Sequence, residues 1–253
     1  MKNNTVIHVE KNNLIFRKSS DFLINWIKLY HNIGQKTLLL LSGGSVVRLN
    51  SDVTQFIKNS DLNFDFLTFA QVDERFQPEN QEDINAYQIE KTGLWKVCKE
   101  KNIPYYLISQ EGTLEKSGEQ YDRTVEKLFK EYVYKVAVLG IGEDGHTAGL
   151  LPGYEKKWNK NKYIVGYRIS QHRQNNAMAL FCQGKRNFPQ RISLTPKALK
   201  ELDQALVVAV GENKKQSLQE LLNGVKNENL NQFPAIIIRN ISKVDLFTDL
   251  PIV

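Results

Sequence analysis

The sequence predicts an α/β fold of the Rossmann-like kind, with a mostly parallel sheet flanked by helices on both faces. Short apolar segments of strand length alternate along the chain with amphipathic segments of helical period. The strand-like segments are apolar on both faces, which is typical of buried parallel strands. Four of them end in polar, mostly glycine-containing loops, at Ser42, Asp73, Gly140 and Gly211. Because the carboxyl ends of parallel strands lie at one edge of a sheet, we expect these loops to converge on one cleft.

A single domain is expected over residues 1–253, since this length suits one large α/β unit and no repeat, linker or composition break divides the chain. Apolar residues make up 41% and charged residues 25%, as in ordinary soluble proteins. No apolar run approaches the roughly 20 residues of a membrane helix, and residues 1–10 lack the core of a signal peptide. Cys98 and Cys182 are too few for a disulfide framework or a metal cluster. These features favour a cytoplasmic protein without membrane contact.

The chain has 34 basic and 28 acidic residues, and its net charge of +6 favours nucleic acid, a membrane surface or a small anion as partner. The densest basic run extends from Lys156 to Lys162, and such runs are usually solvated loops. No nucleic-acid-binding motif accompanies this run. We expect a small-molecule partner, no nucleic acid, and a monomer or a weak dimer.

The first half of the chain predicts alternating strands and helices. Residues 6–17 are expected to form a strand followed by a turn or a second strand. The apolar stripe over residues 19–33 predicts a helix with Ser19 or Ser20 as its cap. The alternation continues through expected strands at Thr37–Leu41, Phe64–Val72 and Tyr105–Ile108, and through expected helices at Val47–Ile57, roughly 81–98 and 113–131.

The second half begins with a central strand at Val136–Leu139, which leads into a glycine-rich loop. Thr195 followed by Pro196 is typical of a helix start, and this helix is expected to reach about Leu202. A further helix is expected after Lys214, to about Leu222. The remaining expected strands are 163–169 and 177–182, which would extend the sheet, and Ala205–Val210, Ala235–Ile238 and Val244–Phe247.

Ser42-Gly43-Gly44-Ser45 lies between a buried strand and a helix and has the composition of a phosphate-binding loop. Glycines expose backbone N–H groups, and a helix N-terminus adds partial positive charge. A tight turn that merely needs glycine is the alternative, and the lysine of a P-loop is absent. Both interpretations stay open from this loop alone.

Asp73-Glu74-Arg75 places three charges directly after a buried strand. An exposed turn is one interpretation of this charge run. An arginine at the end of a strand can also clamp a phosphate through two parallel hydrogen bonds, so both interpretations stay open.

Asp144 and His146 form the strongest candidate catalytic pair. A carboxylate beside a histidine can select its tautomer and stabilise its cation, so that the imidazole acts as a general base near neutral pH. A structural histidine is the alternative, but the position of this pair in a glycine loop after the central strand favours function. His8, His31 and His172 have no such setting and are expected to be surface or core residues.

The same loop, residues 140–145, also satisfies the pattern G-x-G-x-x-G of dinucleotide-binding sites. Such a site needs a long following helix and an acidic residue about 20 positions later. Pro152-Gly153 ends any helix early, and residues 163–169 contain no acid. The sequence therefore argues against a dinucleotide site.

Gly211-Glu212-Asn213-Lys214 places a lysine at the start of a helix, after another buried strand. A surface lysine is the ordinary interpretation. If this loop converges with Ser42–Ser45, Lys214 is placed to contact a phosphate.

Together these motifs resemble the 6-phosphogluconolactonase family, relatives of the glucosamine-6-phosphate deaminases, over nearly the whole chain. The most diagnostic stretch is Leu139 to Ala148, followed by Pro152-Gly153. The other matching landmarks occur in the right order: Leu41 to Ser45, Val72 to Phe76 with Pro78 and Asn85, Arg191 to Thr195, and Gly211 to Lys214.

The resemblance implies the family's fold and the hydrolysis of 6-phospho-D-glucono-1,5-lactone to 6-phosphogluconate, a step of the oxidative pentose phosphate pathway, without a metal or an organic cofactor. By the family pattern His146 activates the attacking water, with Asp144 as its partner. The resemblance also implies which residues bind the phosphate or the sugar hydroxyls: Arg75, Arg191, Lys214, Asp73 and the Ser42–Ser45 loop.

Several positions depart from the family pattern. Val46-Val47 stands where the family usually has Thr-Pro, and Gln77 stands where it often has valine. Serine is usual at the positions of Ile84 and Gly149, and phenylalanine at the position of Leu151. None of these changes removes the base or the phosphate ligands that the resemblance implies. They leave pocket shape and substrate preference open.

Two other functions fit parts of this sequence. The isomerase/deaminase branch resembles this chain as far as the histidine, but carries a glutamate five positions after it, where this chain has Leu151. Leucine cannot transfer a proton, which favours the lactonase interpretation. A non-catalytic sugar-phosphate-binding protein could use the same cleft, and retention of Asp144 and His146 argues against it.

Overall fold

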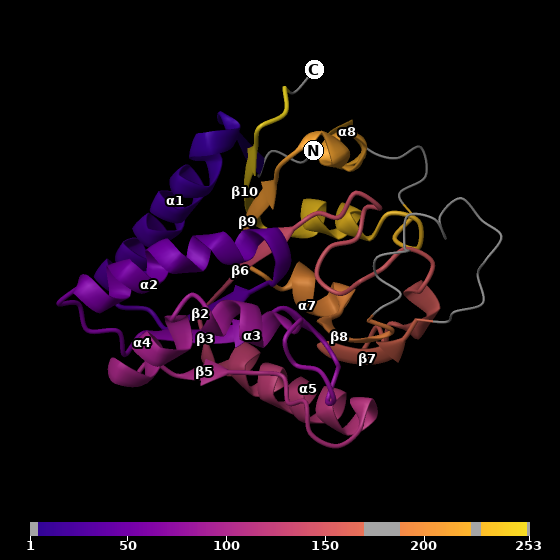
Figure 1. Ribbon diagram of the computed structural model, residues 1–253, viewed down its shortest axis with the longest axis horizontal. Helices are drawn as coiled ribbons and strands as arrows, with labels where there is room; N and C mark the ends of the chain where they lie inside the picture. The colour runs from indigo at the N-terminus through magenta and orange to yellow at the C-terminus, as the bar shows by residue number, and fades with distance from the viewer. Residues whose placement is uncertain (1–4, 170–187, 224–228, 252–253) are drawn as a thin grey trace.

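The computed structural model describes residues 5–169, 188–223 and 229–251, and a parallel sheet lies at its centre (Figure 1). Among the described residues the strand order of this sheet is β1-β10-β9-β6-β2-β3-β5, and each neighbouring pair is parallel. The strands are β1 (Thr5–Val9), β2 (Thr37–Leu41), β3 (Leu67–Gln71), β5 (Tyr105–Tyr106), β6 (Tyr134–Gly140), β9 (Gln204–Ala209) and β10 (Lys243–Thr248). The predicted α/β class is confirmed.

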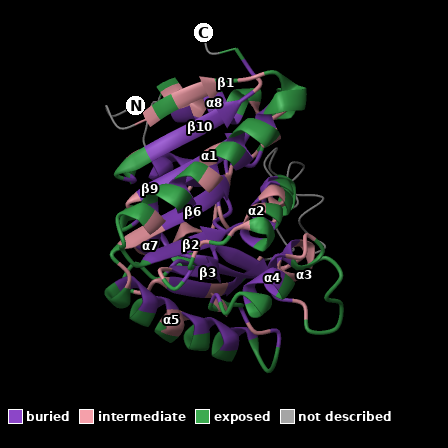
Figure 2. Cartoon of the chain, turned by 90° about the vertical axis from the view of Figure 1, so that its left-hand side faces the viewer, coloured by how far each residue is buried: buried purple, intermediate pink, exposed green. Residues whose placement is uncertain are grey.

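Helices cover both faces of this sheet. The first face carries α1 (Asn12–Asn32), α2 (Leu49–Asn59), α3 (Asn85–Glu90) and α4 (Leu94–Glu100). The second face carries α5 (Leu114–Glu131), α7 (Pro196–Lys200) and α8 (Lys215–Asn223). Leu39 and Leu41 pack in the first core, and Leu38 and Leu40 in the second, because successive residues of a strand face opposite sides. Figure 2 shows buried strands between helices whose outer faces are exposed.

The register of the sheet places the carboxyl ends of its central strands at nearly the same level. Leu41 at the end of β2 pairs with Gln71 at the end of β3 and with Val138 of β6. Gly140 at the end of β6 pairs with Val208 of β9. The loops that follow β2, β3, β6 and β9 therefore emerge at one edge of the sheet, as the sequence predicts.

A second, antiparallel sheet lies beside this edge, and the sequence does not predict it. It consists of β4 (Asp73–Arg75), β8 (Gln190–Leu194) and β7 (Ile164–Arg168), in the order β4-β8-β7. The prediction that residues 163–169 extend the main sheet is thus wrong, although they do form a strand. A three-residue polar strand has no hydrophobic alternation of its own, so only its pairing with β8 reveals it. The expected strand at 177–182 lies outside the described residues, as do His172 and Cys182.

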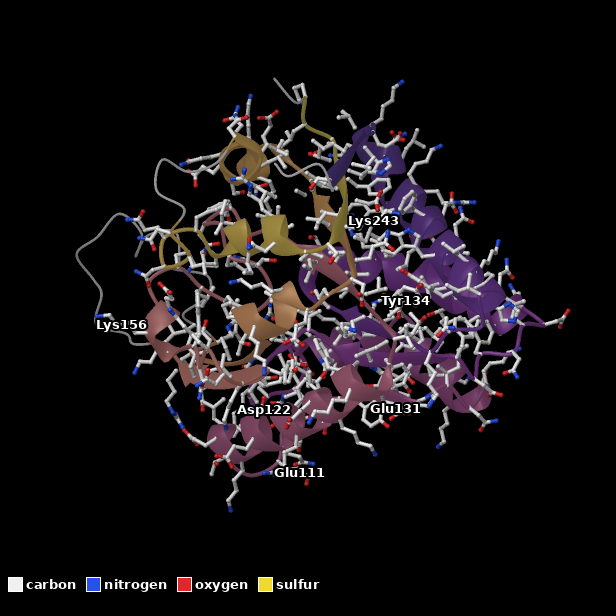
Figure 3. All side chains as sticks on the ribbon, turned by 180° about the vertical axis from the view of Figure 1, so that it is seen from behind. Glu111, Asp122, Glu131, Tyr134, Lys156 and Lys243 are labelled. Carbon is white, nitrogen blue, oxygen red and sulfur yellow. The ribbon has the colours of Figure 1, made fainter. Side chains whose placement is uncertain are left out.

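Helix α5 supports the second sheet from the side. The Asp122 carboxylate accepts hydrogen bonds from the backbone N–H groups of Tyr163 and Ile164, each at 2.9 Å. Figure 3 shows Asp122 on α5, on the side of the helix toward the centre of the molecule. The carboxylate therefore connects α5 to the first residue of β7.

The first helix begins earlier than the sequence predicts. Residues 12–17 belong to α1, whereas a turn or a second strand was expected there. Ser19 and Ser20 do not cap the helix, because their hydroxyls donate to the carbonyl oxygens of Ile15 and Phe16, one turn earlier. This bonding to the fourth preceding residue makes a buried serine compatible with a helix interior.

Two further predicted elements differ from the structure. The helix expected over 81–98 is divided into α3 and α4, since Gly93 adopts a left-handed conformation at φ +80° between them. The strand expected at Ala235–Ile238 is a 3₁₀ helix spanning Pro234–Asn240. Ala235 and Ile236 to Ile238 are all buried, so an all-apolar segment could not be assigned by periodicity.

Among the described residues the longest helix is α1, with 21 residues, of which eleven are polar or charged. None of the helices in the described residues is both long enough and apolar enough to span a membrane.

Candidate functional site

A cavity of about 470 Å³ opens where the loops at the carboxyl edge of the main sheet meet the second sheet. Every residue that the sequence predicts for the site lines this cavity except Asp144, which contacts His146. The lining residues are Ser42, Gly43, Gly44, Ser45, Asp73, Arg75, Asn85, Gly140, Ile141, His146, Ala148, Gly149, Leu151, Phe188, Arg191, Val210, Asn213 and Lys214. The predicted convergence of distant polar loops is therefore present.

The glycine-serine loop after β2 forms one wall of the cavity and leads into a 3₁₀ helix, Gly44–Arg48, ahead of α2. Gly44 has φ +73°, a left-handed conformation that favours glycine. Its N–H donates to Gln88 Oε1 of α3 at 2.9 Å. A Cβ at Gly43 would overlap the side chain of Asn85, so the loop packs directly against the start of α3.

The Asp73-Glu74-Arg75 segment is strand β4, and strand alternation separates its three charges. Asp73 and Arg75 line the cavity, whereas Glu74 is fully buried behind them. Burial raises the pKa of Asp73, while the positive charges of Arg191 and Arg75 oppose that rise. Arg75 Nη1 also donates to the carbonyl oxygen of Asp83 at 2.7 Å. The interpretation of this segment as an exposed turn is wrong.

Arg191 lies on β8, directly opposite Arg75 in the β4–β8 register, and is 7% exposed. Burial lowers the pKa of its guanidinium, and the negative charge of Asp73 opposes this effect. Its Nε is buried without a hydrogen-bond partner among the residues described. The centroid of the Phe188 ring lies 4.4 Å from Cζ of Arg75 and 5.9 Å from Cζ of Arg191. Two guanidinium groups thus share one wall of the cavity and one aromatic neighbour.

His146 is held against a buried carboxylate. Its Nδ1 lies 2.5 Å from Asp144 Oδ1, and its backbone N–H donates to the same oxygen at 3.2 Å. The Asp144 side chain is 1% exposed and the His146 side chain 27%. The carboxylate therefore selects a tautomer with a proton on Nδ1, which leaves Nε2 as the proton acceptor of the neutral ring.

The glycines of this loop are required by close contacts. A Cβ at Gly142 would overlap the His146 ring and Asp144 Oδ1, and one at Gly145 would overlap the Phe233 ring. Gly145 also has φ +77°. The Gly142 N–H donates to the carbonyl oxygen of His146 at 2.7 Å, which closes the loop. The imidazole therefore lies directly against the backbone of Gly142, and the loop that carries it packs against Phe233.

The chain after His146 is attached to the second sheet. The Gly149 N–H donates to Ser193 Oγ at 2.9 Å, and Tyr167 donates its hydroxyl to the carbonyl oxygen of Gly149 at 2.6 Å. A Cβ at Gly149 would lie 2.9 Å from Cβ of Ser193, so the serine common in the family does not fit here without a shift. Leu151, the other departure in this stretch, is buried at 2% exposure.

Lys214 approaches the cavity from the loop after β9. Gly211 begins this loop with φ +97°, and its N–H donates to Asp249 Oδ1. Asn213 Nδ2 donates to Glu143 Oε2 at 3.5 Å, which joins this loop to the one that carries His146. In the part of the chain that is described, Lys214 Nζ takes part in no ion pair, so its charge is available to an anion.

The cavity therefore has two chemically different sides. One carries Arg75, Arg191 and Lys214 with the glycine-serine loop, groups suited to a small anion. The other carries the His146 imidazole, a base suited to taking a proton from water. No group of three or more His, Cys, Asp or Glu side chains in residues 5–169, 188–223 and 229–251 is arranged to bind a metal ion.

Sequence reasoning alone did not assign Phe188, Asn213 or the buried role of Glu74. Phe188 precedes a strand whose hydrophobic pattern is interrupted by Arg191, and no motif distinguishes it. Asn85 was noted only as part of the family landmark. The pairing of β4 with β8 places Glu74 and brings Phe188 near the site, and local periodicity does not reveal that pairing. Asn213 instead comes from the loop after β9.

Comparison with known proteins identifies a family. The model for glucosamine-6-phosphate isomerases/6-phosphogluconolactonase matches residues 14–247. The 6-phosphogluconolactonase of Xylella fastidiosa (strain 9a5c) is 28% identical over 190 residues, which is 73% of this chain and 71% of that protein. The 6-phosphogluconolactonase of Borreliella burgdorferi is 26% identical over 205 residues, which is 79% of this chain and 77% of that protein. The glucosamine-6-phosphate deaminase of Streptococcus uberis is 25% identical over 219 residues, with 85% and 86% covered.

Solved structures share the fold. The 6-phosphogluconolactonase of Thermotoga maritima superimposes with a TM-score of 0.76 at 20% identity, over 96% of this chain and 99% of that one. The 6-phosphogluconolactonase of Shewanella baltica gives a TM-score of 0.75 at 18% identity, with 98% and 99% covered.

Proposed function

Since the chain belongs to the glucosamine-6-phosphate isomerase/6-phosphogluconolactonase family, we propose that it hydrolyses 6-phospho-D-glucono-1,5-lactone to 6-phospho-D-gluconate. One observation carries the proposal: the His146 imidazole, paired with a buried carboxylate, faces the same cavity as Arg75, Arg191 and Lys214. Relatives named 6-phosphogluconolactonase support the choice of substrate. A phosphate on the cationic side would place the lactone ring toward the imidazole.

The proposed reaction begins with deprotonation of water by Nε2 of His146. The hydroxide forms a bond to the lactone carbonyl carbon, and the resulting oxyanion collapses with cleavage of the ring ester bond. The leaving ring oxygen takes the proton from the imidazolium, which regenerates the neutral base. Asp144 stabilises the transient imidazolium, and its contact at 2.5 Å keeps the ring oriented.

Binding of the phosphate fixes the ring relative to this base. The Ser42–Ser45 loop offers N–H groups beside a helix start, and Arg75, Arg191 and Lys214 offer positive charge. Asp73, also on the cavity wall, can accept hydrogen bonds from sugar hydroxyls. Anchoring of this kind makes the attack of water effectively intramolecular, which is a large part of the rate advantage.

The runner-up is ring-opening isomerisation or deamination of glucosamine 6-phosphate, the activity named for the relative from Streptococcus uberis. By the family resemblance that reaction uses a glutamate five positions after the histidine. Leu151 occupies this position here, buried at 2% exposure on the cavity lining. An apolar side chain cannot transfer a proton, so the lactonase reaction fits the site better.

Purified protein added to freshly generated 6-phosphogluconolactone tests the proposal. Acid release is followed against spontaneous hydrolysis of the same solution, and glucosamine 6-phosphate is supplied in parallel. We expect catalysed acid release with the lactone and no ammonia or fructose 6-phosphate from the amino sugar. Tight binding of 6-phosphogluconate without any turnover would instead indicate a sugar-phosphate-binding protein.

A further inference from the structure

Glu74 is a buried carboxylate beside the cavity that the proposed reaction does not use. Its side chain is fully buried, and it faces away from the cavity because its neighbours on β4, Asp73 and Arg75, face into it. Leaving such a charge unpaired in a protein interior is costly, so its partners indicate what it does.

Four N–H donors surround the Glu74 carboxylate. Oε1 accepts from the backbone N–H groups of Arg75 at 2.7 Å and Asn85 at 2.6 Å. Oε2 accepts from the backbone N–H of Ala86 and from Gln71 Nε2, both at 2.8 Å. The Gln71 amide cannot turn its oxygen toward Glu74, because Gln71 Oε1 accepts from the Ile108 N–H at 2.6 Å. All four partners are therefore donors, which only a carboxylate satisfies.

Two of these donors are the first backbone N–H groups of α3. No side chain preceding α3 caps it, so the Glu74 carboxylate takes the place of a cap and connects α3 to β4. The Asn85 side chain adds a second connection, since its Nδ2 donates to the carbonyl oxygen of Asp73 at 2.9 Å.

Helix α3 in turn contacts the glycine-serine loop at two places. Gln88 Oε1 accepts from the Gly44 N–H at 2.9 Å, and the Asn85 side chain fills the space where a Cβ of Gly43 would lie. A continuous set of contacts therefore runs from Glu74 through α3 to the backbone of the loop that lines the cavity.

We propose that Glu74 is a positioning residue that holds α3, and through it Gly43 and Gly44, in the conformation that binds the phosphate of the substrate. This inference rests on the proposed function. Glu74 does not line the cavity, so it acts on KM through the shape of the loop rather than on the chemical step. The carboxylate is thus part of the binding site although it lies outside the cavity.

Glu74→Gln is the direct test, since it keeps size and shape but turns one acceptor into a donor that faces two other donors. Measured above the pKa of Glu74, which burial raises to about 7, the variant is expected to raise KM about tenfold or more with kcat little changed. Asp245→Asn is the matched control. It alters another buried carboxylate, which accepts from Gln204 on the distant β10 side of the sheet. It should lower the melting temperature and leave KM unchanged.

A double-mutant cycle distinguishes positioning from general destabilisation. Gln88→Ala removes the contact of α3 with the Gly44 N–H and should raise KM by itself. If Glu74 acts through α3, the Glu74→Gln and Gln88→Ala effects on KM are non-additive, because the second change removes a contact that the first has already weakened. Additive effects would overturn the proposed route through α3.

The outcomes separate this inference from the proposed function. If the wild type turns over the lactone and Glu74→Gln melts earlier with unchanged KM, Glu74 is structural only and the inference is wrong. If Glu74→Gln does not fold, Glu74→Asp, which keeps the charge but withdraws it from α3, must raise KM. If the wild type has no turnover, the proposed function fails. Calorimetric binding of 6-phosphogluconate then decides: equal affinity of the wild type and Glu74→Gln would overturn the inference.

Discussion

Alanine at Gly142 is expected to displace the proposed base while leaving the fold intact. The added Cβ would overlap the His146 ring and Asp144 Oδ1, so the imidazole must move by about 1 Å or more. Gly142 is not among the residues with positive φ in the described chain, so alanine can adopt its backbone conformation. The His146 side chain lines the cavity and is 27% exposed, so the imidazole can move into the cavity, whereas the Asp144 side chain, 1% exposed, must shift within the protein.

A misplacement of about 1 Å in a catalytic group costs about 10²-fold in rate. We therefore expect Gly142→Ala to lower kcat about 10²-fold in the lactone assay, with KM changed little because the cationic side is untouched. Because the buried Asp144 carboxylate must also shift, we expect the variant to fold but to unfold at a lower temperature than the wild type.

Gly140→Ala provides the matched control for this change. Gly140 lies two positions earlier, at the end of β6, and a Cβ there would meet only Val46 Cγ1, at an ordinary 3.8 Å. This variant should retain most of the wild-type kcat. A folded Gly142→Ala protein with wild-type kcat would refute the assignment of His146 as a base that depends on its present position.

Three further predictions concern the base, the anion site and Glu74. His146→Ala should lower kcat about 10²–10⁴-fold while 6-phosphogluconate still binds, as measured by steady-state kinetics and calorimetry; near wild-type turnover would remove its proposed role. Lys214→Ala should chiefly raise KM for the lactone, and an unchanged KM would exclude Lys214 from the phosphate site. Burial raises the pKa of Glu74 from its ordinary 4.5 to about 7, so between these values the folded state binds a proton that the unfolded state lacks. The contribution of Glu74 to the free energy of unfolding is therefore greatest below about pH 4.5. It falls by on the order of 3 kcal/mol as the pH rises to about 7. Urea unfolding at several pH values should show this fall in the wild type relative to Glu74→Gln, and parallel curves for the two proteins would contradict it.

Much of the fold could be predicted because its strands are buried on both faces. Residues 38–41 of β2 and 205–209 of β9 are all apolar, and that composition indicates a parallel sheet with helices on each side. The same property concealed the 3₁₀ helix Pro234–Asn240, in which residues 235–238 are equally apolar and buried. Composition identifies burial in both cases, but burial does not distinguish a short strand from a short helix.

The two halves of the site differ in how far the sequence could predict them. Asp144 and His146 lie two positions apart, so their contact is local and follows from the glycine loop that carries them. Arg75 and Arg191 face each other only because β4 pairs with β8, and neither strand has a pattern that names its partner. Glu74 was likewise one charge among three until strand pairing showed which side of β4 it occupies.

The sequence by itself determined the α/β class, the edge of the sheet at which polar loops gather, and the identity of the acid–histidine pair. These properties depend on alternation along the chain and on contacts between near neighbours. Only the tertiary structure decided that a small antiparallel sheet closes the cavity, that two arginines share its wall, and that Glu74 faces α3 rather than the cavity. Such long-range pairing is selected by the summed burial and hydrogen bonding of the whole fold, which no short segment encodes.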